Sequence, residues 1–123
     1  MTISLPSGQD FHSKMRELKW SSTEKAIARR CFDRVLRQEL DAAIQSTKEM
    51  TAKIQQASEL WELEHHLTQL RKEIDRKYEY KYSKLIFVFG DLVREGKLDL
   101  EELRGLSEDK LRYIREHAVK YAD

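Results

Sequence analysis

Apolar residues recur at spacings of three and four along most of the chain, the period of an α-helix with one buried face. The first such series contains Ile27, Cys31, Val35, Leu40, Ile44 and Ile54. It begins after Ser21, whose hydroxyl can accept from the backbone of Glu24 while the carboxylate of Glu24 reaches back. No glycine or proline follows before Ser58, so we predict a helix on the order of 50 Å long at 1.5 Å per residue.

A second apolar series follows Ser58, which we expect to cap a second helix. Its members are Leu60, Leu63, Leu67, Leu70, Ile74 and Tyr78. The connection between the two helices is short, which predicts an antiparallel hairpin. A narrow leucine stripe of this kind pairs with another helix. We therefore expect Leu60, Leu63, Leu67 and Leu70 to form the interface between two copies of the chain.

The stretch YEYKYSKLIFVF, residues 78–89, is ambiguous between helix and strand. Tyrosines at 78, 80 and 82 alternate as in a strand, and an apolar block follows them. However, Tyr82, Leu85, Phe89 and Leu92 keep the helical spacing, and the rest of the sequence offers no second strand for pairing. We interpret the stretch as helical, with a kink near Ser83.

The C-terminal part reads as short helices separated by glycines. Gly96 is expected to end the preceding helix in a left-handed conformation. Asp99 with Glu102 then starts a short helix that Gly105 ends, and Ser107 opens a last helix to about Tyr121. The apolar residues of this last helix are expected to pack against residues 85–93; they are Leu111, Ile114 and Ala118.

These elements predict an all-α protein consisting of a long antiparallel helical hairpin, the stalk, and a small helical head. We place a flexible N-terminal extension at 1–20, since Pro6 and Gly8 lie there without a periodic pattern. A single domain covers 21–123, with the stalk at about 21–82 and the head at about 83–121. Charged residues make up 37% of the 123 residues, which is typical of solvated helices with narrow apolar stripes, and a chain of this size is expected to oligomerise.

The composition argues against several classes of protein. The formal charge is +1, so no overall field attracts nucleic acid or anionic lipid. The longest apolar run, 85–89, is far shorter than the roughly 20 residues that cross a bilayer. Cys31 is the single cysteine, which excludes an internal disulfide and suits a reducing cytoplasm. We expect a cytoplasmic protein without a transmembrane segment.

Metal binding, catalysis and nucleic-acid binding receive little support. His65 and His66 point about 100° apart on a helix, and Glu62 with His66 supplies only two ligands, so no metal or other cofactor is expected. The sequence contains no phosphate loop and no nucleophile motif, so we expect neither an enzyme nor a small-molecule substrate. A basic stripe at Arg30, Arg34 and Arg37 could contact phosphates or an acidic protein, but a solvated helix face is the favoured interpretation.

Three residues stand out as candidates for contact with a partner. Trp61 lies beside the leucine stripe, where an indole can anchor a partner, although burial within the hairpin fits the sequence equally well. The guanidinium of Arg71 suits carboxylates of a partner. Phe87 and Phe89 are core aromatics by default, but so dense an apolar block can leave one ring exposed for docking.

The sequence resembles the fluorescence recovery protein family of cyanobacteria from about Ser22 to Tyr113. The specific parts are Leu60-Trp61-x-Leu63, the RKEIDRKY run at 71–78, the IFVF block at 86–89 and the tract through Glu101, Glu102 and Leu103. The resemblance implies a non-enzymatic homodimer without a cofactor. It would bind the C-terminal domain of photoactivated orange carotenoid protein, speed its return to the orange form and so end phycobilisome quenching, working in the cytoplasm or at the thylakoid periphery.

Trp61, Arg71 and Phe87 match the family residues implied in partner binding, and the resemblance also points to Glu64, His65, Lys110 and Tyr113 near them. The sequence departs from the family here: Glu64 and His65 replace a His-Asp pair, His66 a phenylalanine and Tyr113 a lysine. These departures fall on the implied partner surface. Two alternatives follow: a helical scaffold for another client in a non-photosynthetic bacterium, or a nucleic-acid-associated helical protein.

Overall fold

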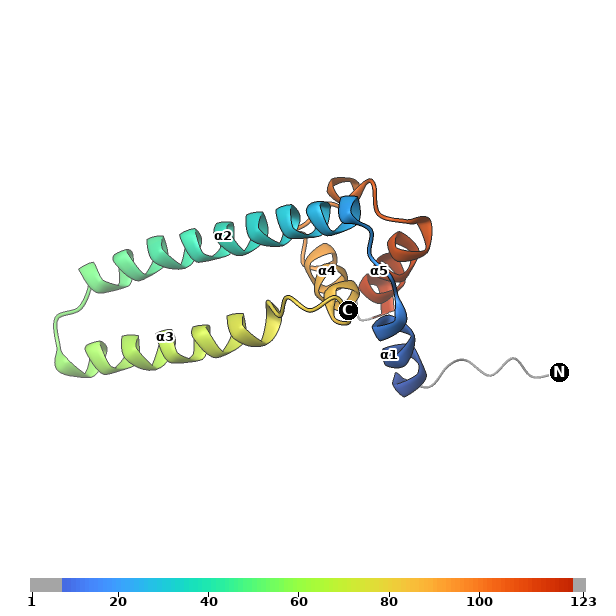
Figure 1. Cartoon of the computed structure of the whole chain (residues 1–123). Coiled ribbons are helices and arrows are strands. Elements are labelled where there is room, and N and C mark those ends of the chain that lie inside the picture. Colours follow the sequence, from blue (N-terminus) through green and yellow to red (C-terminus); the bar gives the residue numbers. More distant parts are fainter. Residues whose placement is uncertain (1–7, 121–123) are drawn as a thin grey trace. The chain divides into compact units, whose positions relative to one another are not determined.

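The structure is a computed structural model that describes residues 8–120, and within this range it is all-helical, as predicted (Figure 1). The predictions that fall on 1–7 and 121–123 lie outside the described residues. The helices are α1 (Gly8–Glu17), α2 (Ser22–Ala52), α3 (Ala57–Lys77), α4 (Leu85–Arg94), the 3₁₀ helix η1 (Leu100–Leu103) and α5 (Glu108–Lys120). No helix among residues 8–120 is long and apolar enough to cross a membrane.

The start of α2 follows the predicted capping box. The backbone N–H of Glu24 donates to Ser21 Oγ at 3.1 Å, and the N–H of Ser21 donates to Glu24 Oε1 at 3.0 Å. Both donors would otherwise be unsatisfied at a helix start. The helix then continues for 31 residues, or about 46 Å at 1.5 Å per residue, which confirms the long first helix.

Two predicted boundaries of the second helix are wrong. Helix α3 begins at Ala57 with Gln56 at the N-cap and no side-chain cap, so Ser58 lies inside the first turn. The helix ends at Lys77, and 78–84 is non-helical instead of continuing with a kink. Tertiary contacts of the tyrosines replace helix here: Tyr78 donates a hydrogen bond to the carboxylate of Glu39, and the ring of Tyr80 meets Phe32 edge-on at 4.9 Å.

The N-terminal extension also differs from the prediction, because residues 8–17 form helix α1. Phe11, Met15 and Leu18 are spaced four and three apart, and this helical period carries the inward face of the segment. Met15 is 1% exposed and Trp20 is buried as well. A sequence interpretation led by Pro6 and Gly8 overlooked these apolar positions.

The turns of the C-terminal part agree with the sequence. Gly96 and Gly105 have φ values of 74° and 111°, in the region that favours glycine. Between them, Asp99 and Glu102 form a second capping box at the start of η1. Helices α4 and α5 then pack together as expected, through side chains that include Leu85, Phe89, Leu92 and Ile114, all fully buried.

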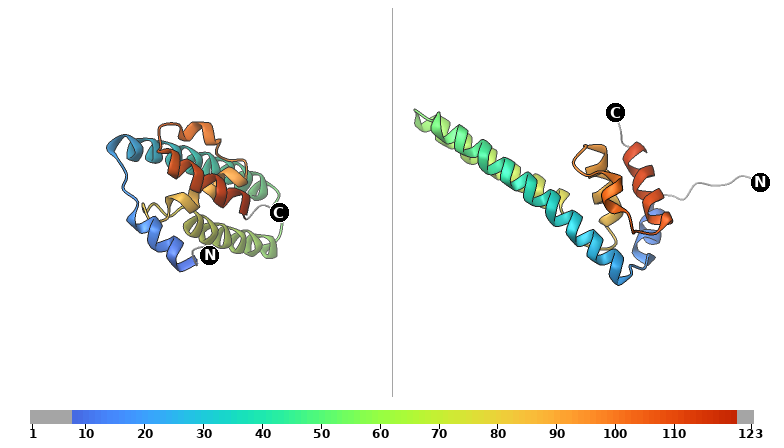
Figure 2. Two further views of the ribbon diagram at one scale, coloured as in Figure 1. Left: turned by 90° about the vertical axis from the view of Figure 1, so that its right-hand side faces the viewer. Right: turned by 90° about the horizontal axis from the view of Figure 1, so that it is seen from above.

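The chain divides into two compact units. The compact unit joins residues up to Phe32 with those from Glu79 onward and contains α1, the first part of α2, α4, η1 and α5. The hairpin unit, Asp33–Tyr78, contains the rest of α2 and α3, which run antiparallel (Figures 1 and 2). The start of α2 belongs to the compact unit, and not with the predicted stalk, because Ile27, Ala28, Cys31 and Phe32 are buried there.

Candidate functional site

The hairpin unit presents an apolar surface formed by both of its helices. Two helices alone cannot enclose a core. The exposed large apolar side chains of this unit are Trp61 and four aliphatic ones, Leu40 and Ile44 of α2 with Leu60 and Leu67 of α3. We call these four residues the hairpin apolar surface. Of the predicted interface residues, Leu60 is 46% exposed and Leu70 is half-buried, whereas Leu63 is buried within the hairpin. Exposed leucines at this density are typical of a surface that another protein covers.

Trp61 and Arg71 are both open to a partner. The Trp61 side chain is 63% exposed, so it does not fill the hairpin, which was the alternative interpretation. The Arg71 side chain is 85% exposed and forms a loose ion pair with Asp75 at 3.9 Å. Ten residues separate them on α3, or about 15 Å along the helix axis. A partner that contacts both must span roughly three turns of α3.

The neighbours of Trp61 that depart from the family pattern are exposed as well. Glu64, His65 and His66 all lie on the surface of α3. Among residues 8–120, no group of three or more His, Cys, Asp and Glu side chains could hold a metal ion.

Phe87 belongs to the compact unit and is half-buried. Its ring meets His117 of α5 edge-on at 5.2 Å, and Phe11 of α1 edge-on at 5.6 Å. Nε2 of His117 in turn lies 2.9 Å from Asp91 Oδ1, which ties α5 to α4. Phe89, by contrast, is fully buried in the core. Phe89 thus occupies the core, as predicted by default for both rings, whereas Phe87 is only half-buried.

Lys110 and Tyr113 of α5 point inward. The Lys110 ammonium donates to both carboxylate oxygens of Glu24 at 3.1 and 3.2 Å and to the carbonyl of Lys19 at 2.7 Å. The two charged side chains are 6% and 10% exposed. Tyr113 is 7% exposed beneath α1. A partner could reach either side chain only after the surrounding segment moved.

The surroundings of Glu24 lower the pKa of its carboxyl group. Burial by itself raises the pKa of this carboxyl, but hydrogen bonds from the backbone N–H groups of Ser21 and Ser107, together with Lys110, outweigh it and lower the pKa to about 2. The carboxylate is thus charged at any physiological pH. Glu24 thereby links the start of α2 to the start of α5. The sequence predicted only its role in the capping box of α2.

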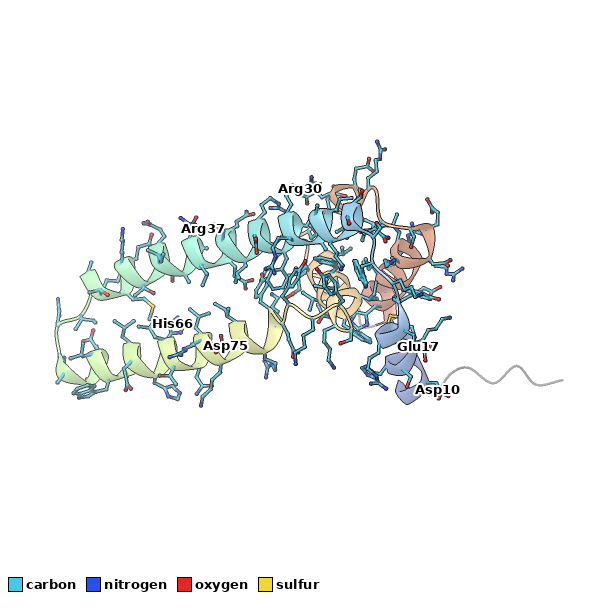
Figure 3. All side chains as sticks on the ribbon, viewed as in Figure 1. Asp10, Glu17, Arg30, Arg37, His66 and Asp75 are labelled. Carbon is cyan, nitrogen blue, oxygen red and sulfur yellow. The ribbon has the colours of Figure 1, made fainter. Side chains whose placement is uncertain are left out.

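The basic stripe of α2 has local partners. Arg34 donates to Gln38 Oε1 at 2.9 Å, and Arg37 Nε lies 3.3 Å from Asp41 Oδ1. Arg37 projects from the side of α2 turned away from α3 (Figure 3). Pairing along one helix face is the usual arrangement of a solvated surface, which agrees with the favoured interpretation of this stripe.

Sequence reasoning missed the side chains that surround Phe87. Phe11 and His12 of α1 both contact its ring, at 5.6 and 4.8 Å between centroids. The period of Phe11, Met15 and Leu18 was the available signal for the helix that carries them. Their contact with α4, more than 70 positions later, left no trace in the local pattern.

The described residues thus form helices with exposed apolar and aromatic side chains on α3 and a half-buried ring on α4, features typical of helical proteins that bind other proteins. Residues 20–118 match the family described as "Photoprotection regulator fluorescence recovery protein". The match covers most of the chain, so this chain belongs to the fluorescence recovery protein family.

Individual relatives agree with the family match. The chain is 36% identical over 99 residues to the fluorescence recovery protein of Synechocystis sp., covering 80% of this chain and 91% of that protein. The solved structure of the Fremyella diplosiphon fluorescence recovery protein superposes with a TM-score of 0.78 at 38% identity, covering 82% of this chain and 99% of the other. The Synechocystis structure gives the same TM-score and coverage at 36% identity.

Proposed function

We propose that this chain is a homodimeric regulator that binds the C-terminal domain of photoactivated orange carotenoid protein and accelerates its return to the orange form. Membership of a family of photoprotection regulators carries the proposal. Trp61 and Arg71 support it, since the side chains that the resemblance assigns to the partner are exposed on α3. Return to the orange form then ends energy dissipation at the phycobilisome.

The mechanism needs no covalent chemistry. A protein accelerates a conformational change when it binds the conformation between the two states more tightly than the starting state. A rigid helix with an indole and a guanidinium about 15 Å apart can hold two points of a client in one relative position. The acceleration should therefore depend on both side chains and saturate with the concentration of the regulator.

The direct test follows the red-to-orange reversion of photoactivated orange carotenoid protein in the dark, with and without the purified chain. We expect a faster reversion that saturates. Arg71→Lys keeps the charge but loses the planar fork, and should raise the half-saturating concentration about tenfold. Arg76→Lys, at an exposed arginine about 140° away around α3, is the matched control and should behave as the unmodified chain. The absence of any acceleration at saturation would refute the proposal.

The homodimer is tested separately at the hairpin apolar surface. Leu60→Glu places a charge within the proposed interface and should shift the sedimentation coefficient from that of a dimer to that of a monomer. Gln69→Glu adds the same charge on the opposite face of α3 and should leave the dimer intact. A dimer that persists unchanged after Leu60→Glu would show that the two copies meet through another surface.

A further inference from the structure

Helix α1 covers the part of the compact unit that holds Phe87 and Tyr113. The ring of Phe11 meets Phe87 edge-on at 5.6 Å and Tyr113 edge-on at 6.0 Å. The ring of His12 lies over Phe87 at 4.8 Å, and the Lys14 ammonium lies 5.0 Å from the centre of the Tyr113 ring. Three side chains of one short helix, at positions 11, 12 and 14, thus contact the two rings.

This helix is an addition to the segment shared with the family. The family match begins at residue 20, whereas α1 ends at Glu17. The match to the Fremyella diplosiphon structure covers 99% of that chain but only 82% of this one. The remaining 18% (100 − 82) of this chain therefore has no counterpart in that structure. The contacts to Phe87 and Tyr113 therefore come from a segment that the matched relatives do not align with.

The segment that follows the C-terminal end of α1 is held against the compact unit. The linker after α1 is fixed because Lys110 donates to the Lys19 carbonyl at 2.7 Å and its ammonium lies 5.0 Å from the Trp20 ring. A segment tethered this close to its docking face has a high effective concentration there. Leu18 lies between α1 and these fixed residues.

The helix itself has little stability without that face. It has ten residues, fewer than the roughly 12 to 15 at which an isolated helix becomes marginally stable in water. Its other side carries exposed polar residues, including Asp10 and Glu17 (Figure 3). Docking and helix formation are therefore coupled, and loss of a single apolar contact should favour the undocked segment.

We propose that α1 is a built-in competitor of the client: it lies on the Phe87 surface, and the client must displace it in order to bind there. The inference rests on the proposed function, because Phe87 is assigned to the client by the family resemblance. In this arrangement the apparent dissociation constant equals the intrinsic one divided by the fraction of molecules in which α1 is undocked. The affinity of the chain for its client is thus set by a segment outside the shared family region.

The test uses the full chain with Phe11→Ala, which removes both edge-to-face contacts of α1 with Phe87 and Tyr113. The larger undocked fraction should lower the apparent dissociation constant for photoactivated orange carotenoid protein several-fold. Arg16→Ala shortens an exposed side chain of the same helix and is the control. Phe11→Asp, which places a charge against the two rings, should act in the same direction as Phe11→Ala.

Hydroxyl-radical labelling of Phe87 and Tyr113, read by mass spectrometry without any client, separates the two proposals. Labelling should increase several-fold in both Phe11 variants and stay unchanged in Arg16→Ala. Unchanged labelling would overturn the inference, as would increased labelling with an unchanged or weaker affinity for a client that does bind. If the client binds none of the variants while labelling increases, the proposed function fails, and the role of α1 as a competitor fails with it.

Discussion

The pair formed by Glu24 and Lys110 allows a quantitative prediction from the structure. The carboxylate accepts from Lys110 and from the backbone N–H groups of Ser21 and Ser107, the latter at 2.9 Å. The lowering of the pKa of Glu24 from 4.5 to about 2 corresponds to about 3 kcal/mol of folded-state stability at 1.36 kcal/mol per pH unit. Removal of one partner from a buried pair costs about 3–5 kcal/mol, since the other charge is left uncompensated.

Glu24→Gln should therefore reduce the free energy of unfolding at pH 7 by about 3 kcal/mol or more. The folded-state pKa lies below the unfolded value, so the contribution of Glu24 is complete above about pH 4.5 and is lost as the pH falls toward 2. The unmodified chain should lose stability across this range. Glu24→Gln should lose about 3 kcal/mol less over the same range, because the group that titrates is absent.

The assay is urea denaturation followed by circular dichroism at pH 7, 5, 4 and 3, with the protein concentration held constant because the chain is proposed to dimerise. The double variant Glu24→Gln with Lys110→Met removes both charges and should be more stable than Glu24→Gln alone. A cost below about 1 kcal/mol at pH 7, or equal pH dependence of the variant and the unmodified chain, would refute the argument.

One further prediction concerns the backbone geometry at two glycines, and another concerns a cation–π contact. Gly105→Ala should cost about 2–4 kcal/mol in urea denaturation, because φ is 111° and the added Cβ would lie 2.4 Å from Ile27 Cδ1. Gly96→Ala, at φ 74° with nothing within 4 Å, should cost only about 1 kcal/mol, and equal costs would contradict the steric argument. Arg29→Gln should cost about 0.5–1 kcal/mol by the same measurement, since the guanidinium lies 3.6 Å from the centre of the Tyr80 ring; a neutral result would mean that this contact adds nothing.

The features that sequence predicted well are those specified within a few residues. The capping boxes at Ser21 and Asp99 and the left-handed glycines at 96 and 105 depend on groups at most three or four positions apart. The helical period of the first apolar series likewise identified a long α2. Such local requirements are visible in the order of the residues alone.

The features that sequence predicted poorly depend on residues far apart in the chain. The break after Lys77 arises from contacts of Tyr78 with Glu39 and of Tyr80 with Phe32, which outweigh the helical spacing of the tyrosines. Glu24 was recognised as a cap, but its partner Lys110 lies 86 positions later. The sequence did not decide whether Trp61 is exposed or buried, because that depends on how α2 and α3 pack within the hairpin unit. The structure leaves it 63% exposed.

Cys31 gives the chain a practical property. It is the single cysteine of the sequence, it is 3% exposed, and its thiol donates to the carbonyl of Glu102 at 3.4 Å. Buried thiols in apolar surroundings react slowly with alkylating reagents. A new cysteine introduced on the exposed side of α3, for example through Gln69→Cys, would therefore be the preferred target of a maleimide dye. A fluorescent reporter of client docking can thus be attached without removal of the native thiol.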